Sequence, residues 1–166
     1  AHRRRIGLLG QQPLLFPHLD VLSNVAYGPR AQKLRRDEAR ALALEMLERL
    51  DAADLASRRP GELSGGQAAR VALARALATR PRAMLIDEPF AALDVEYTPR
   101  LRVAVKAALA EVGCPCIIVT HDPADVAALA DDVAVLDNGR IVEHGPAAEV
   151  MARPESSFGK LLFTQK

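Results

Sequence analysis

The sequence predicts an α/β fold in which mostly parallel strands carry an inserted α-helical subdomain. Three short apolar runs, at 83–87, 116–120 and 133–136, alternate with helical stretches in the second half of the chain. Such alternation is typical of parallel strands that helices cover on both faces. About half of the 166 residues (49%) are apolar, so the chain can build a core, and its length fits one domain.

The first part of the chain is predicted to be mainly helical. Residues 6–9 form a short apolar strand candidate, and two prolines mark 11–17 as a loop. A short helix is expected over 19–27, ended by the Gly-Pro pair that follows. Apolar residues at three- and four-residue spacing predict a longer helix over 37–50.

The later elements follow from caps and turn residues. Ser64 is well placed to cap a helix over 68–78, which Pro81 then stops. The Asp-Asn-Gly-Arg sequence at 137–140 predicts a tight hairpin turn. Further helices are expected at 96–112, 123–130 and 147–152, and a polar tail closes the chain.

Charge and composition argue against several classes of partner. The chain has 22 Lys and Arg against 21 Asp and Glu, a net charge of +1, so it has no overall attraction to nucleic acid or anionic lipid. No apolar run approaches the roughly 18 residues of a membrane span, and the first residues do not resemble a signal peptide. Any contact with a membrane is therefore expected to run through another subunit.

The cysteines and three of the histidines have no predicted chemistry. Cys114 and Cys116 would share one face of a strand, at a spacing too wide for an easy disulfide. We therefore expect two reduced thiols rather than a redox or metal site. His2, His18 and His144 show no metal-ligand spacing.

A glycine-rich helix start is the first candidate site. In Leu63-Ser64-Gly65-Gly66-Gln67, a small polar residue and two glycines precede the helix expected at 68–78. Exposed N–H groups and the positive end of the helix dipole favour a phosphate there, and glycines let the backbone approach it closely. The alternative is an ordinary Ser-capped helix after a glycine turn.

Two acids form the second candidate site. Asp87 and Glu88 end an apolar run, so a buried strand would deliver both carboxylates to the carboxyl edge of a parallel sheet, where ligands bind in such folds. Asp87 can help to hold hydrated Mg²⁺, and Glu88 can orient or polarise an attacking water. The alternative is a solvated acidic turn, against which Pro89 and Ala92-Leu93-Asp94 argue.

Together with His121 and Gln11, these motifs resemble the catalytic core of an ATP-binding-cassette (ABC) ATPase, the motor subunit of a membrane transporter. The likeness runs from Ile6 to about Phe158, with the motifs in family order and spacing. It implies a partial P-loop NTPase core, because the phosphate-cradling G-x-x-x-x-G-K-[ST] loop occurs nowhere in the 166 residues.

The resemblance implies a role for each motif residue. It implies catalytic roles for Glu88 and His121, the histidine as a sensor of the γ-phosphate. It implies that the γ-phosphate of ATP held by the opposite subunit is contacted by Ser64, Gly65, Gly66 and Gln67. It also implies that Asp87 and Gln11 bind Mg²⁺, partly through water, that Gln11 is the Q-loop glutamine that relays to the membrane partner, and that Asp94 of the D-loop couples the two sites of the dimer.

The implied cofactors are ATP and Mg²⁺. The implied partners are a transmembrane permease subunit and a second ATPase subunit in a head-to-tail homodimer, with no nucleic acid. The expected location is the cytoplasm, peripheral on the inner face of the cell membrane through the permease. Within the family, the segments 13–28 and 154–159 look most like molybdate-transport ATPases, with sulfate, polyamine, iron and sugar importers as close competitors. The apolar segment 14–27 is either local core or a groove for a coupling helix of the permease.

The expected organisation is one partial ABC ATPase domain over 1–166. It comprises a helical subdomain over 19–63, the signature helix and catalytic α/β core over 64–145, and a C-terminal helix and tail over 146–166. By itself this chain is predicted to be inactive. The alternative function is a non-catalytic module that docks on a membrane subunit or supplies a signature motif in trans. A soluble ABC protein of DNA repair or translation is disfavoured, because coiled-coil heptads, zinc-ligand pairs and a basic arm are lacking.

Overall fold

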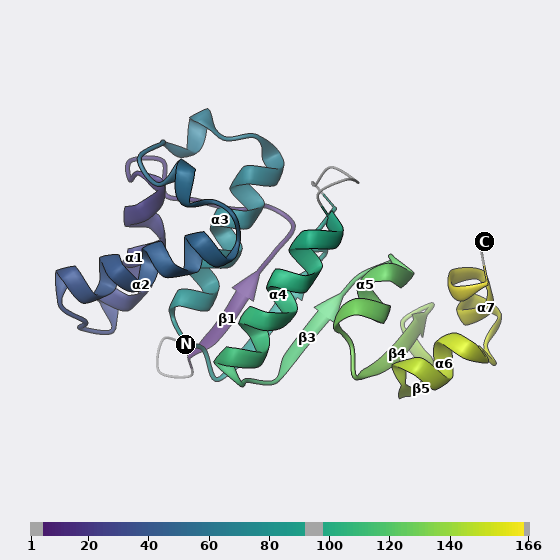
Figure 1. Cartoon of the computed structure of the whole chain (residues 1–166). Helices are drawn as coiled ribbons and strands as arrows, with labels where there is room; N and C mark the ends of the chain where they lie inside the picture. The colour runs from purple at the N-terminus through teal and green to yellow at the C-terminus, as the bar shows by residue number, and fades with distance from the viewer. Residues whose placement is uncertain (1–4, 92–97, 165–166) are drawn as a thin grey trace. The chain divides into compact units, whose positions relative to one another are not determined.

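Two compact units make up the chain, Ala1–Val119 and Thr120–Lys166, in a computed structural model that describes residues 5–91 and 98–164. The first unit contains a parallel sheet and a group of helices. The second contains a β-hairpin flanked by short helices (Figure 1).

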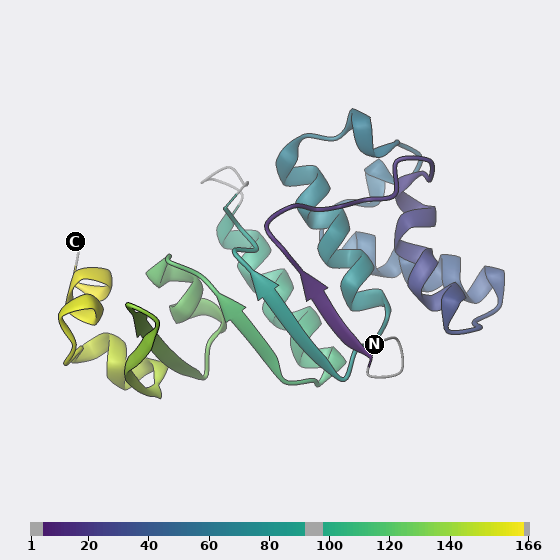
Figure 2. The ribbon, with the colours of Figure 1, turned by 180° about the vertical axis from the view of Figure 1, so that it is seen from behind.

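The parallel sheet consists of β1 (Ile6–Leu9), β2 (Ala83–Asp87) and β3 (Cys116–Val119), in that order. Both strand pairs are parallel, as Figure 2 shows, which confirms the predicted α/β fold with parallel strands. The third apolar run is a correction. It forms β4 (Asp132–Asp137), which pairs antiparallel with β5 (Arg140–Pro146) in a separate sheet, because the tight turn folds the chain straight back on itself.

Within the described part of the first unit, helices pack against one face of the parallel sheet. Helix α4 (Thr98–Val112), the crossover between β2 and β3, lies in front of the strands in Figure 1 and behind them in Figure 2, and α3 (Gly65–Ala78) packs against β1 and α4. On the other face Leu8, Leu85 and Ile117 adjoin in register and are 72%, 39% and 64% exposed. The prediction that helices cover both faces of the sheet stays a prediction.

The helical region contains α1 (Val21–Ala31), α2 (Arg36–Arg49) and two 3-10 turns at Ala53–Leu55 and Pro60–Glu62. These elements fall in the range 19–63, whose status as a separate subdomain stays a prediction. Helix α1 packs against both α2 and α3.

Helix α1 does not end at its Gly-Pro pair, so the predicted end is wrong. A Cβ at Gly28 would lie 2.4 Å from Thr79 Cγ2, so the glycine allows the close approach of α1 to the end of α3. Pro29 is buried inside the helix, and the Gln32 side chain donates to the Thr79 carbonyl at 2.8 Å. Tertiary packing thus outweighs the local stop signal.

The remaining predicted helices are confirmed with small shifts in their ends. The helix after Ser64 begins at once, three residues earlier than predicted, because Ser64 caps it. Within the described parts of the chain, no helix combines the length and apolar character needed to cross a bilayer. The other confirmed helices are α2, α4, α5 (Pro123–Leu129) and α6 (Ala147–Ala152).

The second unit is stapled by Glu143. Asn138 and Gly139 take left-handed φ values of 47° and 75° and close the predicted hairpin. The expected polar tail instead contains α7 (Ser157–Phe163), capped by Ser156 Oγ, which accepts from Gly159 N at 2.9 Å. The Glu143 carboxylate accepts from Ser156 Oγ at 2.6 Å and Glu155 N at 2.8 Å, which lowers its pKa. The contact of Glu143 with residues 155 and 156 therefore orders a segment that the local sequence predicted to be an irregular tail.

A buried asparagine fixes the loop that leads into α1. Asn24 is fully buried, and its Nδ2 donates to the carbonyl oxygens of Phe16, Leu19 and Asp20 at 3.1, 3.2 and 3.0 Å. Its Oδ1 accepts from Phe16 N at 2.8 Å. The side chain thus bonds four backbone groups of the loop, although the Phe16 and Asp20 carbonyls also accept from Leu19 N and Asn24 N.

We predict that Asn24→Ala lowers the free energy of unfolding by about 2–4 kcal/mol, because it removes all four hydrogen bonds of a fully buried side chain and leaves a cavity. Urea unfolding followed by circular dichroism measures the change. Ser23→Ala, one residue earlier on the same helix, is the control and should cost less than about 0.5 kcal/mol. Equal effects of the two substitutions would contradict the prediction.

Candidate functional site

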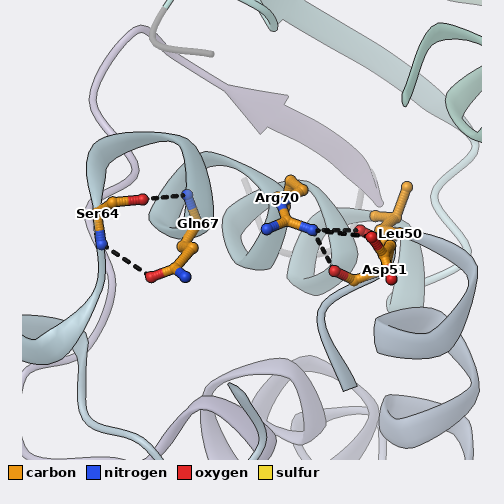
Figure 3. A network of polar contacts seen from close by, with 5 residues as sticks. All are labelled: Leu50, Asp51, Ser64, Gln67 and Arg70. Carbon is orange, nitrogen blue, oxygen red and sulfur yellow. Dashed lines mark hydrogen bonds and ion pairs between the residues drawn. The ribbon is translucent and has the colours of Figure 1, made fainter. Parts of the chain in front are cut away.

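The start of helix α3 is open to solvent and reciprocally capped. Ser64 Oγ accepts from Gln67 N at 3.2 Å, and Gln67 Oε1 accepts from Ser64 N at 3.0 Å (Figure 3). Ser64 and Gly65 are exposed, and Gly66 is half-buried. The first N–H groups of a helix lack partners within it, and the capping box occupies only one of them, so the N–H groups of Gly65 and Gly66 remain at the positive end of the helix. This end can accept an anion.

The rest of α3 is fixed in place. One face of the helix is buried in the core of the first unit. Arg70 donates to the carbonyl oxygens of Leu50 and Asp51 at the end of α2, and its Nη1 lies 3.7 Å from the Asp51 carboxylate (Figure 3). The open start of α3 therefore belongs to a helix that is tied to the helical region. The buried residues are Val71, Ala72, Leu73, Ala74, Leu77 and Ala78.

The acids lie at the carboxyl end of β2, as predicted. Asp87 is the last residue of the strand and pairs in register with Val119 of β3. Glu88 has a φ of +48°, a strained value for a residue with a side chain, and its N–H donates to the Val119 carbonyl at 2.9 Å. Both acids are half-buried. The left-handed residue turns the chain out of the sheet, so two consecutive carboxylates stand at one edge.

Gln11 belongs to the same edge of the sheet. It is exposed and follows β1 by two residues, and Leu9 at the end of β1 pairs with Ile86 of β2. Parallel strands end at the same edge, so Gln11 and Asp87 follow neighbouring strand ends. The exposed neighbour Gln12 shares this loop.

The donors at this edge suit magnesium better than a transition metal. Carboxylate and amide oxygens are the ligands that Mg²⁺ prefers, and this ion usually keeps several waters and takes substrate phosphates. Among residues 5–91 and 98–164 there is no group of three His, Cys, Asp or Glu that could hold a metal by itself. The edge therefore fits a Mg²⁺ held by one or two protein ligands and a nucleotide.

His121 lies in the second unit, exposed in the loop before α5. Thr120 Oγ1 donates to Asp125 Oδ2 at 2.6 Å and accepts from Asp122 N at 3.1 Å. Asp122 caps α5 by accepting from Ala124 N at 2.8 Å. The backbone on both sides of His121 is thus held. Because Glu88 belongs to the first unit, its meeting with His121 in one site stays a prediction.

Two other outcomes complete the site residues. Asp94 lies outside the described residues. The sequence analysis did not predict that Thr120 and Asp125 hold the loop that carries His121. The available signal was an acid four residues after the histidine, in the first turn of the helix expected at 123–130. Asp125 is only 4% exposed.

Both cysteines are free thiols, as predicted. Burial, together with the neighbouring Cys114, raises the pKa of Cys116 to about 11. Burial also raises the pKa of Cys114. Neither thiol is therefore activated as a nucleophile at neutral pH, since the thiolate is the reactive form.

The chain is similar to known proteins. A family model described as ABC transporter matches residues 1–91, more than half of the chain. The chain belongs to the ABC transporter family. It is 48% identical, over 163 residues, to the molybdenum import ATP-binding protein ModC of Mycobacterium tuberculosis (strain H37Rv), covering 96% of this chain and 44% of that protein.

Other relatives of this chain are named for the import of different solutes. The Fe(3+) ions import ATP-binding protein FbpC of Pseudomonas fluorescens is 47% identical over 95% of this chain and 44% of its own length. The spermidine/putrescine import ATP-binding protein PotA of Acidothermus cellulolyticus is 43% identical over 95% of this chain and 41% of its own length. The chain thus spans less than half the length of these relatives.

A solved structure supports the ABC ATPase fold. It is described as the dimeric structure of a post-hydrolysis state of the ATP-binding cassette MJ0796 bound to ADP and Pi. The match has a TM-score of 0.77 and 33% sequence identity, and it covers 87% of this chain and 64% of that one. The predicted family and fold class are confirmed.

We predict that Asp125→Ala loosens the loop that carries His121. The substitution removes a buried charge-assisted hydrogen bond and should destabilise the loop by about 1.5–3 kcal/mol. Amide hydrogen exchange at 121–124 measures the effect. Asp131→Ala, an exposed acid in the same unit, is the control. Unchanged exchange at 121–124 in Asp125→Ala would disprove the assigned contact.

Proposed function

We propose that the chain is part of the ATP-hydrolysing motor subunit of an ABC importer. The observation that carries the proposal is the open, glycine-rich start of α3, held by the Ser64–Gln67 capping box. The acids Asp87 and Glu88 at the end of β2 support it, in the order that the family uses.

The α3 start would bind the γ-phosphate of ATP held by a second subunit. A serine hydroxyl has one proton and two lone pairs, so Ser64 Oγ can accept from Gln67 N and still donate to a phosphate oxygen. The N–H groups of Gly65 and Gly66 add donors at the positive end of the helix. The side chain of Gln67 holds the turn that presents these groups.

The sheet edge would serve the other side of the phosphates. Asp87 and Gln11 are the proposed Mg²⁺ ligands, partly through water, and the ion when bound would offset charge on the β- and γ-phosphates. Glu88 is proposed to orient the attacking water and hold its proton. His121 is proposed to sense the γ-phosphate, and Asp94 to couple the two sites of a dimer.

The proposed partners follow from this division of labour. A signature that acts on the opposite subunit's nucleotide requires a head-to-tail homodimer. The proposed membrane partner is a permease subunit, which would place the motor in the cytoplasm on the inner face of the cell membrane. Leu14 and Tyr27, 74% and 53% exposed, offer apolar surface for it in the segment 14–27.

Molybdate or a related oxyanion is the proposed cargo. The support is the 48% identity to ModC and the likeness of the segments 13–28 and 154–159 to molybdate motors. Relatives named for iron and for spermidine/putrescine are nearly as similar. Uptake of molybdate, sulfate, iron and polyamine by a strain lacking the gene, with and without the restored protein, tests the choice.

The alternative is a non-catalytic ABC module that docks on a membrane subunit or supplies a signature in trans. G-x-x-x-x-G-K-[ST] does not occur in these 166 residues, whereas a signature candidate does. Mg²⁺-dependent ATP hydrolysis by the full-length protein separates the two proposals.

We predict that the 166-residue chain alone hydrolyses ATP negligibly, because it has no P-loop lysine and no nest of N–H groups for the β- and γ-phosphates. In the full-length protein, Glu88→Gln should lower kcat at least about 100-fold by removing the carboxylate base. A coupled phosphate-release assay measures both. Robust turnover by the isolated chain, abolished by Glu88→Gln, would overturn the first expectation.

We predict opposite effects of two substitutions on assembly of the full-length protein with ATP and Mg²⁺. Glu88→Gln should accumulate the ATP-bound dimer, because it keeps the shape of the site and blocks the chemical step. Ser64→Arg should prevent closure, since it puts bulk where the γ-phosphate must sit. Gel filtration reports the dimer, with Glu62→Gln as a nearby control. A monomeric Glu88→Gln protein, or a Ser64→Arg protein that dimerises like the parent, contradicts a signature acting in trans.

A further inference from the structure

One arginine on α3 contacts the loop that follows Gln11. Arg75 Nη1 donates to the Leu14 carbonyl at 3.0 Å, and Nη2 donates to the Pro13 carbonyl at 3.1 Å. The guanidinium carbon lies 5.1 Å from the centre of the Phe16 ring. A single side chain therefore holds two carbonyl groups and one aromatic face of the same short loop.

Partial burial removes water from the Arg75 guanidinium, which is unfavourable for its charge. It is half-buried, and burial lowers its pKa from the ordinary value. Within residues 5–91 and 98–164 no carboxylate forms a salt bridge with it, so its charge interacts with the loop carbonyls and the Phe16 ring. A guanidinium can donate in two directions and stack at once, whereas an ammonium cannot.

The loop is held in a shape that it would not adopt by itself. Leu14 has a φ of +43°, a left-handed value that a leucine adopts only when its surroundings enforce it. Its side chain is mostly exposed, so side-chain burial does not enforce the shape. The Arg75 contact to the Leu14 carbonyl supplies a restraint at this residue, while Asn24 restrains the far end of the loop.

Arg75 also lies on the helix whose start is the proposed phosphate contact. Eleven residues separate it from Ser64, roughly 16 Å along a helix axis. Helix α3 is continuous from Gly65 to Ala78, and most of its second half is buried in the first unit. A displacement at its open end is therefore carried to Arg75 as a movement of the whole helix.

We propose that Arg75 is a positioning residue that transmits nucleotide-driven movement of α3 to the loop 13–16 and to the exposed apolar surface beside it. That surface comprises the exposed Leu14 and Tyr27, and the half-buried Phe16 ring lies 4.7 Å from the Tyr27 ring. The proposal rests on the proposed function, since it assumes that α3 meets a phosphate. It assigns Arg75 a mechanical role between that contact and the surface available to a membrane partner.

The test is hydrogen exchange of the full-length protein, with and without ATP and Mg²⁺. In the parent, ATP should slow exchange at both 65–70 and 13–19. Arg75→Met keeps much of the apolar stem and removes both donors. It should preserve the response at 65–70 and reduce the response at 13–19 at least about threefold, with Arg75→Lys intermediate.

Arg70→Met is the matched control, because it removes an arginine-to-carbonyl contact from the same helix to a different loop. It should leave the ATP response at 13–19 intact. A full response at 13–19 in Arg75→Met, or an equal loss in Arg70→Met, overturns the proposal. If Arg75→Met does not fold, Arg75→Lys decides: it must preserve the response at 65–70 and reduce the response at 13–19 below that of the parent. Failure of both to fold also overturns it, since Arg75 would then act on stability alone.

Failure of the proposed function gives a different result. If ATP changes exchange at neither 65–70 nor 13–19 in the parent, the phosphate contact is wrong. The Arg75 clamp on the loop is then judged without nucleotide, where Arg75→Met must raise amide exchange at 13–19 at least about tenfold, as expected for a lost charge-assisted bond. A smaller rise rejects the clamp as well.

Discussion

Burial of one face of α3 is the constraint on which the first unit depends. The helix packs against α1 and α2 on one side and against β1 on the other, so it joins the helical region to the parallel sheet. Apolar burial of this kind is non-directional and would by itself allow the helix to slide. Polar contacts to other segments set its register: Arg70 donates to the Leu50 carbonyl, Arg75 donates to the Leu14 carbonyl, and the Thr79 carbonyl accepts from Gln32.

Local signals predicted the parts of the fold that local physics controls. A serine before two glycines predicted the cap of α3, and the Asn-Gly pair predicted the hairpin turn, because both depend on residues within four positions. The stop at Gly28 was overridden by Thr79, about fifty residues away, and the tail was ordered by Glu143. Such contacts cannot be read from a window of sequence.

The candidate site divides in the same way. The strand pattern placed Asp87 at a sheet edge, whereas Gln11 was identified only by the family resemblance, and the structure puts both after neighbouring strand ends. The left-handed backbone of Glu88 and the Thr120–Asp125 bond were not predictable, because each reflects a balance with residues outside its own segment. The motif residues were thus accessible from sequence, whereas the groups that hold them in place required coordinates.

The uncovered face of the parallel sheet has a consequence for handling the protein. An exposed apolar patch runs across the three strands and consists of Leu8, Leu85 and Ile117. Exposure of such a patch to water is unfavourable. We therefore expect the 166-residue chain to self-associate through this patch in concentrated solution.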